Sequence, residues 1–162
     1  MKNDQETPSS RVIVHRNEDI EWFDAIPGEH VGIRVKGEDV NGAYSVFDLI
    51  MDPSYGVPIH IHLRGDEIFR VIEGKAHFYV DGQEFDAEVG EVVVVPKGIK
   101  HAFANFSDTP LLLSIMFTPA GDEHSFKDVF GKKPEEVIEL AKEKYQIIIV
   151  GPPLIKNTEL KK

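Results

Sequence analysis

The stretch from Gly56 to Gly74, with the sequence GVPIHIHLRGDEIFRVIEG, decides the fold. Residues two apart in a β-strand point to the same face, about 6–7 Å apart along the chain, so His60 and His62 project side by side. Residues 63–66 can turn the chain, which lets Glu67 begin a neighbouring strand and face the same way. The pattern therefore predicts two imidazoles and one carboxylate on the same face.

These three side chains are of the type that binds a divalent first-row metal. The 162-residue chain has seven histidines and no cysteine, so any metal site must use imidazole nitrogen and oxygen. The alternative is that both histidines lie on the exposed polar face of an amphipathic strand. Apolar residues of opposite parity weaken that alternative, because charges on an interior face need partners or a metal. These residues are Ile59, Ile61, Ile68 and Ile72.

A second stretch, GEVVVVPKGIKHAFAN from Gly90 to Asn105, carries another histidine. Its valine run, Val92–Val95, would lose rotamer freedom in a helix and fits a strand covered on both faces. We expect this strand to end at Pro96 and the next one to open at His101. On its own, His101 fits a hydrogen-bonded core or surface histidine better than a metal ligand.

Together, the two stretches resemble the motifs of the cupin superfamily. The first family motif is H-x-H, three or four residues, Glu, six residues and Gly. The second is Gly, five residues, Pro-x-Gly, two residues, His, three residues and Asn. The matching positions here are His60, His62, Glu67, Gly74, Gly90, Pro96, Gly98, His101 and Asn105. One departure is Ser54, which stands where the first motif opens with a turn glycine.

Resemblance to the cupins implies an all-β fold, a jelly-roll (double-stranded β-helix) barrel, here with one or two C-terminal α-helices. It also implies one divalent first-row transition metal per chain, of the set Fe, Mn, Ni, Co, Cu or Zn, bound inside the barrel. The residues that match the family's metal ligands are His60, His62, Glu67 and His101.

Outside the motifs, the chain resembles the quercetin dioxygenase-like single-domain cupins at Val57–His62, Phe117–Gly121 and Gly151–Leu154. This resemblance implies a metal-dependent oxidoreductase, a quercetin 2,3-dioxygenase-like dioxygenase acting on a small aromatic or enolizable substrate. Fold and ligand set do not fix a reaction. The alternatives are a metal-dependent isomerase or lyase on the same barrel, and a non-catalytic cupin that binds a small molecule.

Glu67 is the predicted catalytic residue, because it is the only ligand suited to proton transfer; a purely structural ligand is the alternative. Candidate substrate-pocket residues share a strand face with the ligands or precede the first motif. They are Phe47, Met51, Tyr55, Pro58, Phe69, Val71, Phe103 and Asn105. An apolar, aromatic wall suits a flat hydrophobic substrate better than a sugar phosphate.

The chain length predicts one domain with flexible ends. We predict a disordered arm over residues 1–10, the barrel over 11–120, a helical extension packed on it over 121–155, and a flexible tail over 156–162. In the extension, Phe126, Val129 and Phe130 have helical spacing, with Asp122 placed to cap. A second helix is predicted over 134–145, followed by an extended segment over 147–150.

The dipeptides Asn41-Gly42 and Asp81-Gly82 lie between apolar segments and favour the positive φ angles of tight hairpin turns.

The balance of 18 Lys+Arg against 28 Asp+Glu gives a formal net charge of -10. Phosphates demand a basic patch, so this balance predicts no nucleic-acid or membrane partner. No apolar run approaches the roughly 20 residues that cross a bilayer, and the N-terminus is polar, so we expect a cytoplasmic protein. The isoleucines that point out of the barrel need cover, which a strand near Val12–Val14, the C-terminal helices or a second subunit could supply. Resemblance to the cupins, which often pair through such a sheet face, implies a homodimer.

Overall fold

The computed structural model describes residues 12–156, so the predicted arm over 1–10 and residues 157–162 of the predicted tail lie outside the described residues. The strands are β1 (Trp22–Asp24), β2 (Glu29–Val35), β3 (Ser45–Met51), β4 (Pro58–His62), β5 (Asp66–Glu73), β6 (Lys75–Val80), β7 (Gln83–Glu88), β8 (Val92–Val95), β9 (His101–Ala104), β10 (Leu111–Thr118) and β11 (Ile147–Pro153). The helices are η1 (Asn17–Asp19), η2 (Gly37–Val40), η3 (Asp122–His124), α1 (Ser125–Val129), α2 (Pro134–Leu140) and η4 (Ala141–Tyr145).

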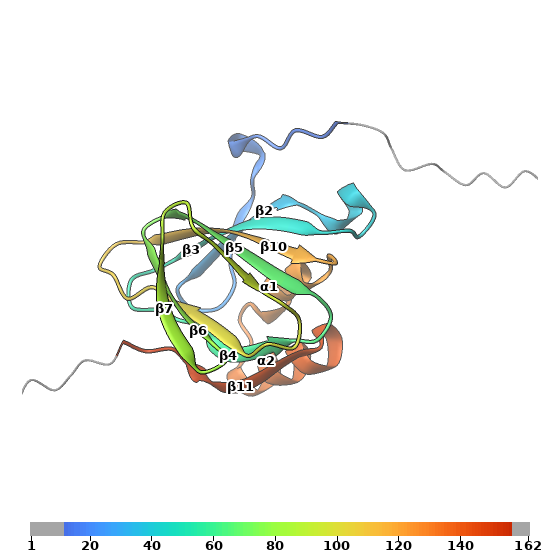
Figure 1. The fold of residues 1–162 in the computed structure, drawn as a ribbon. Helices are drawn as coiled ribbons and strands as arrows, with labels where there is room; N and C mark the ends of the chain where they lie inside the picture. Colours follow the sequence, from blue (N-terminus) through green and yellow to red (C-terminus); the bar gives the residue numbers. More distant parts are fainter. Residues whose placement is uncertain (1–11, 157–162) are drawn as a thin grey trace, which may run out of the picture.

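The strands form two antiparallel sheets that face each other as a barrel (Figure 1). The larger sheet has the order β1-β2-β3-β10-β5-β8, and the smaller has the order β11-β4-β9-β6-β7. Consecutive strands therefore often belong to different sheets, and the chain crosses the barrel repeatedly. The two short helices lie between β10 and β11 in the chain, and β11 then pairs with β4 at the edge of the smaller sheet.

Buried side chains fill the barrel interior along strands in which buried and half-buried residues alternate. In β10, the side chains of Leu111, Leu113, Ile115 and Phe117 are buried, and the residues between them are half-buried. This period of two is the signature of a strand with one face in a core. Across the barrel, the ring centroid of Phe69 lies 5.2 Å from those of Phe78 and Phe103, and this aromatic cluster closes one part of the interior.

The valine run forms a strand, as predicted, but the prediction that it is covered on both faces is wrong. Strand β8 lies at the edge of the larger sheet and pairs with β5. Val92 is 55% exposed and Val94 is 58% exposed, whereas Val95 is buried. β-Branched side chains favour extended backbone whether or not both faces are covered, so the run predicted the strand and not its place in the sheet.

Both predicted turn dipeptides have positive φ angles. Asp81 (φ 47°) and Gly82 (φ 89°) join β6 directly to β7, which confirms the tight hairpin. Asn41 (φ 54°) and Gly42 (φ 77°) follow the short helix η2, so the connection from β2 to β3 is longer than a hairpin turn.

The predicted second helix is confirmed over its full span. Helix α2 begins at Pro134 and continues into the π-helical turn η4, which ends at Tyr145. Pro134 stands in the first turn, where its missing N–H has no intrahelical partner to lose. The segment after it, predicted to be extended from Ile147, is β11. Within residues 12–156, no helix is long and apolar enough to span a bilayer.

Candidate metal centre

Four side chains from three strands meet inside the barrel. His60 and His62 stand on β4, Glu67 on β5 and His101 on β9. Strands β4 and β9 are neighbours, with His60 directly opposite His101 in the register. One possible ligand atom from each of the four residues lies within 4.8 Å of the others. The structure thus brings together the four residues that the cupin resemblance implied.

The spacing of the atoms suits a single small cation. His60 Nε2 lies 3.2 Å from His62 Nε2, and the carboxylate oxygen Oε2 of Glu67 lies 3.2 Å from His62 Nε2 and 2.9 Å from His101 Nε2. Ligand atoms about 2.1 Å from a metal are about 3 Å apart when their bonds meet at right angles. The cluster therefore fits one divalent metal bound by three imidazoles and a carboxylate.

Two of the histidines are oriented by their own strands. His60 Nδ1–H donates to the carbonyl oxygen of Pro58 at 2.7 Å, and His101 Nδ1–H donates to that of Ile99 at 3.0 Å. In each pair the acceptor lies two residues earlier in the chain. A proton held on Nδ1 leaves Nε2 free as the ligand atom.

The third histidine is oriented by a carboxylate from the C-terminal segment. His62 Nδ1 lies 2.9 Å from Oδ2 of Asp122, a residue of η3 that is 5% exposed. Arg64 pairs with the other carboxylate oxygen of Asp122 at 3.7 Å. Such a carboxylate behind a ligating imidazole fixes its tautomer and strengthens it as a ligand.

The structure places the Asp122 side chain differently from its prediction. It was predicted to cap a helix, but no side-chain cap is formed at α1, and its carboxylate faces His62 instead. The neighbouring Glu123, 1% exposed, holds this segment in place by accepting hydrogen bonds from Ser45 Oγ (2.9 Å) and Gly37 N–H (3.3 Å). The contacts of Asp122 with His62 and of Glu123 with Ser45 and Gly37 join segments far apart in the chain, so no local motif predicts them.

Burial and neighbouring charges shift the pKa values of His60, His62 and Glu67 in different directions. Burial, with His101 and His62 nearby, lowers the pKa of His60 to about 3. Burial also opposes the charge on His62, but the carboxylates of Glu67 and Asp122 outweigh it and raise the pKa of His62 to about 9. Burial alone would raise the pKa of Glu67, but His62 and His101 hold it below its usual value. The proton on His62 must therefore leave before its Nε2 can bind a metal.

A cavity of about 100 Å³ opens beside this cluster. His60, His62 and Glu67 line it together with apolar side chains such as Phe103, Ile115 and Phe117. A buried carboxyl that the sequence analysis did not single out, that of Glu29 at the start of β2, also lines it. Burial, with the Glu67 carboxylate second, raises the pKa of Glu29 to about 8.

The predicted substrate-pocket residues do not all lie at this cavity. Phe103 lines it. Phe47, Met51, Phe69 and Val71 are buried members of the hydrophobic core and are not among its lining residues. Their predicted contact with a substrate stays a prediction.

The remaining three lie at or near the segment that precedes β4. Pro58 is half-buried, and its carbonyl accepts the hydrogen bond from His60. Tyr55 is 43% exposed. The buried amide of Asn105 donates to the carbonyl oxygens of Met51 (3.0 Å) and Thr109 (2.7 Å), which ties the loop before β10 to the end of β3. These contacts give Asn105 a structural role.

Comparison with known proteins agrees with this architecture. Residues 47–117 match the family model described as Cupin domain. The protein has the cupin jelly-roll fold. The structure of KdgF from Halomonas sp. is similar, with a TM-score of 0.61 and 21% identity over 67% of this chain and 96% of that one. An RmlC-like cupin from Shewanella frigidimarina NCIMB 400 has a TM-score of 0.59 and 23% identity, covering 68% of this chain and 93% of that one.

A curated relative adds sequence similarity but no function. An uncharacterized protein of Aquifex aeolicus (strain VF5) is 35% identical over 63 residues, which are 39% of this chain and 51% of that protein. The chain spans about half the length of the curated relatives it matches. The matches support the cupin superfamily, and the structural similarity at these identities concerns the fold rather than a reaction.

Proposed function

We propose that the protein is a metal-dependent oxidoreductase, a dioxygenase-like cupin that acts on a small aromatic or enolizable compound. The observation that carries the proposal is the four-residue cluster with a cavity directly beside it. Four protein ligands leave one or two positions of a five- or six-coordinate metal open, which a catalytic site needs. Bound there, a first-row metal would supply Lewis acidity and, for a redox-active ion, electron transfer to or from dioxygen.

The protein's own residues would orient the candidate ligands and keep water away from them. The Nδ1 contacts of the three histidines hold the imidazoles in one tautomer and one direction. The apolar side chains of Phe103, Ile115 and Phe117 limit water near the cluster. Glu67 is the ligand able to accept or return a proton of a bound hydroxyl compound, and we propose it as the catalytic residue.

One observation favours an isomerase or lyase as the second candidate. Glu29 places a further carboxyl in the same cavity as Glu67. A pair of carboxyl groups whose environments push their pKa values apart is the usual arrangement for acid–base chemistry. Structures of similar fold include proteins described as a polyketide cyclase, a sugar phosphate isomerase and a predicted oxalate decarboxylase.

Oxygen uptake separates these functions. Protein loaded in turn with Fe, Mn, Ni, Co, Cu or Zn would be incubated with flavonols, catechols and enolizable diketones while dissolved oxygen and products are followed. Substrate-dependent oxygen consumption with ring cleavage is expected. Product formation without oxygen uptake would replace the proposal by the isomerase or lyase. Binding without turnover for every metal would replace it by a binding protein. His101→Ala serves as the metal-ligand variant, and His124→Ala, at a half-exposed histidine, as its control.

We also propose a homodimer that pairs through the outer face of the larger sheet. Ile72 on β5 is 41% exposed, and Val92 and Val94 on the adjacent β8 are more exposed still. Burying such a patch favours association. Light scattering should give twice the chain mass, and Val92→Lys with Val94→Lys should return it to the monomer. A monomer mass for the unmodified protein would end this proposal.

The cytoplasmic location also stays a proposal, supported by the cysteine-free composition. Cell fractionation tests it, and recovery of the protein outside the cytoplasm would contradict it.

A further inference from the structure

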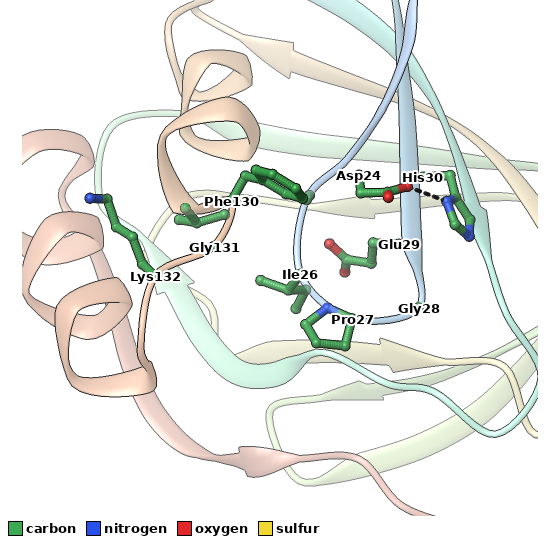
Figure 2. Close-up of a pocket in the computed structure, with 11 residues that line it drawn as sticks. Asp24, Ile26, Pro27, Gly28, Glu29, His30, Phe130, Gly131 and Lys132 are labelled. Atoms are coloured by element: carbon green, nitrogen blue, oxygen red, sulfur yellow. Dashed lines mark hydrogen bonds and ion pairs between the residues drawn. The ribbon is translucent and has the colours of Figure 1, made fainter.

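A second, larger cavity lies outside the metal cluster. It has a volume of about 400 Å³ and is bounded by the turn between β1 and β2 and by the segment that follows α1 (Figure 2). We call it the outer pocket, and the cavity beside the four candidate ligands the inner cavity. Ile26, Pro27 and Phe130 give the outer pocket an apolar wall, and Lys132 adds one cationic side chain.

Glu29 lines both cavities. In Figure 2 its carboxyl group points into the space bordered by Ile26 and Pro27, away from His30, its neighbour on β2. Helix α1 is also shared, because Phe126 lines the inner cavity and Val129 lines the outer pocket. Glu29 and helix α1 therefore form walls that the outer pocket and the inner cavity share.

The two cavities differ in volume. The inner cavity, at about 100 Å³, is smaller than the usual range of about 300–1,000 Å³ for small-molecule sites. The outer pocket, at about 400 Å³, falls within the usual range of about 300–1,000 Å³ for small-molecule sites. The outer pocket is therefore the larger of the two spaces that could take the body of a ring compound whose oxygen reaches the cluster.

The surroundings of Glu29 favour its protonated form. The side chain is 4% exposed, and no hydrogen bond within residues 12–156 offsets the burial that raises its pKa. A protonated carboxyl at such a place is a hydrogen-bond donor for an oxygen atom that carries negative charge. Two oppositely charged side chains also line the outer pocket. The Asp24 carboxylate pairs with His30 at 2.7 Å, and the Lys132 ammonium can attract an anionic ligand.

We propose that the outer pocket holds the body of an aromatic or enolizable hydroxyl compound, and that the Glu29 carboxyl donates a hydrogen bond to the ligand's oxygen as it enters the inner cavity. This inference rests on the proposed function for the metal at the inner cavity. It assigns to Glu29 the binding of the ligand, and to Phe130 and Ile26 the wall against which the ring packs.

The test uses the Zn²⁺-loaded protein and 4-nitrocatechol, a coloured catechol whose absorbance changes on binding. Zn²⁺ is redox-inert, so the probe is bound and not consumed. Glu29→Gln keeps a donor and should bind the probe within about threefold of the unmodified protein. Glu29→Ala removes the donor and should bind it about 10–100-fold more weakly, the usual worth of a hydrogen bond to a charged group.

The outer pocket is tested separately. Ile26→Trp should fill the pocket and weaken probe binding at least tenfold. Phe130→Ala should weaken it about three- to tenfold through lost apolar contact. Phe130 is 61% exposed, so its removal should leave the fold intact, and Phe85→Ala, at a half-exposed phenylalanine of β7, is the matched control. All variants should hold the same zinc content by elemental analysis.

Unchanged probe affinity in Glu29→Ala, Ile26→Trp and Phe130→Ala, with zinc still bound, would overturn the inference. Equal loss in Glu29→Gln and Glu29→Ala would overturn the donor role of Glu29. If Glu29→Ala failed to fold, Ile26→Trp and Phe130→Ala would still decide whether the outer pocket holds the ring. Absence of turnover with any metal would count against the proposed oxidoreductase, and it would leave these binding results standing.

Discussion

The inner cavity and the outer pocket share the side chain of Glu29, yet they are built from differently spaced segments of the chain. Three of the four candidate ligands, His60, His62 and Glu67, lie on the consecutive strands β4 and β5, and the fourth, His101, lies on β9. The outer pocket joins residues 24–30 to residues 129–132, about a hundred positions later. A short pattern on two consecutive strands places three of the four candidate ligands, whereas the wall that would select a ligand depends on contact between distant segments. Variants of the candidate ligands should therefore change metal binding, and variants of the outer pocket should change binding of the probe.

The largest effect is expected from the ligands themselves. The double variant His60→Ala/His62→Ala should lose stoichiometric metal, because two of four ligand atoms disappear. The affinity should fall by well over 100-fold, more than the about 10–100-fold cost of losing an outer contact to a ligand. Elemental analysis after dialysis measures it. One metal per chain in the double variant would show that the cluster is not the binding site.

The carboxylate behind His62 should have the next largest effect. Asp122→Asn weakens the hold on the imidazole and should lower metal affinity by about 10–100-fold. Asp86→Asn is the control, because Asp86 makes the same kind of contact, 2.8 Å to Nδ1 of His77, on an exposed surface away from the cluster. Competition with a chelator measures both affinities. Equal behaviour of the two variants would remove the role assigned to Asp122.

The affinity of the protein for metal should depend on pH. His62 has a pKa of about 9, so its proton competes with the metal, and apparent affinity should rise up to about tenfold per pH unit below pH 9. Isothermal titration at pH 6.5, 7.5 and 8.5 checks this rise. Affinity that stays flat over this range would contradict the protonation of His62.

The stability of the metal-free protein should change in the opposite sense, because its free energy of unfolding should fall as the pH rises. A raised pKa of His62 stabilises the fold below about pH 6.5, and this contribution is lost as the pH rises through 9. The raised pKa of Glu29 acts in the same direction between 4.5 and about 8. Urea unfolding should show stability lower by on the order of 1–3 kcal/mol at pH 9 than at pH 6.5, with a smaller difference in Glu29→Gln. Stability that rises with pH would contradict both assignments.

The smallest effect is expected from the turn that bounds the outer pocket. Gly28 has a φ of 82°, and a Cβ there would come within 2.3 Å of the Tyr55 ring. Gly28→Ala should therefore cost about 1–3 kcal/mol of stability and shift the turn. Probe binding should weaken while metal content stays at one per chain. Loss of metal in this variant would show that the two regions are not separable.

Much of the cluster could be predicted because its geometry is nearly local. Alternation along β4 puts His60 and His62 on one face, and a short turn brings Glu67 beside them. The prediction for His101 needed the family resemblance, because its place opposite His60 depends on which strands pair. The register between β4 and β9 confirms that placement.

Asp122 and Glu29 could not be found in the same way. The contact between His62 and Asp122 spans 60 positions, and a lone aspartate before a helix is common as a cap. Glu29 is the first residue of β2, and no pattern in the sequence indicates that its carboxyl group is buried in the fold. For the valine run of β8, the strand is predicted correctly and its burial is not. β-Branching favours a strand and carries no information on whether the strand lies at a sheet edge.

Local residue patterns predict several of the strands, the positive φ angles at both turn dipeptides, the second helix and the types of the candidate ligands, because these depend on backbone preferences and on side-chain parity over a few residues. The tertiary structure alone decided which carboxylate stands behind His62, that a second carboxyl is buried beside the cluster, and that a larger pocket opens next to it. The physical reason is that burial and long-range pairing arise when the two sheets close around a common interior, and no local pattern of residues specifies which distant segments then come into contact.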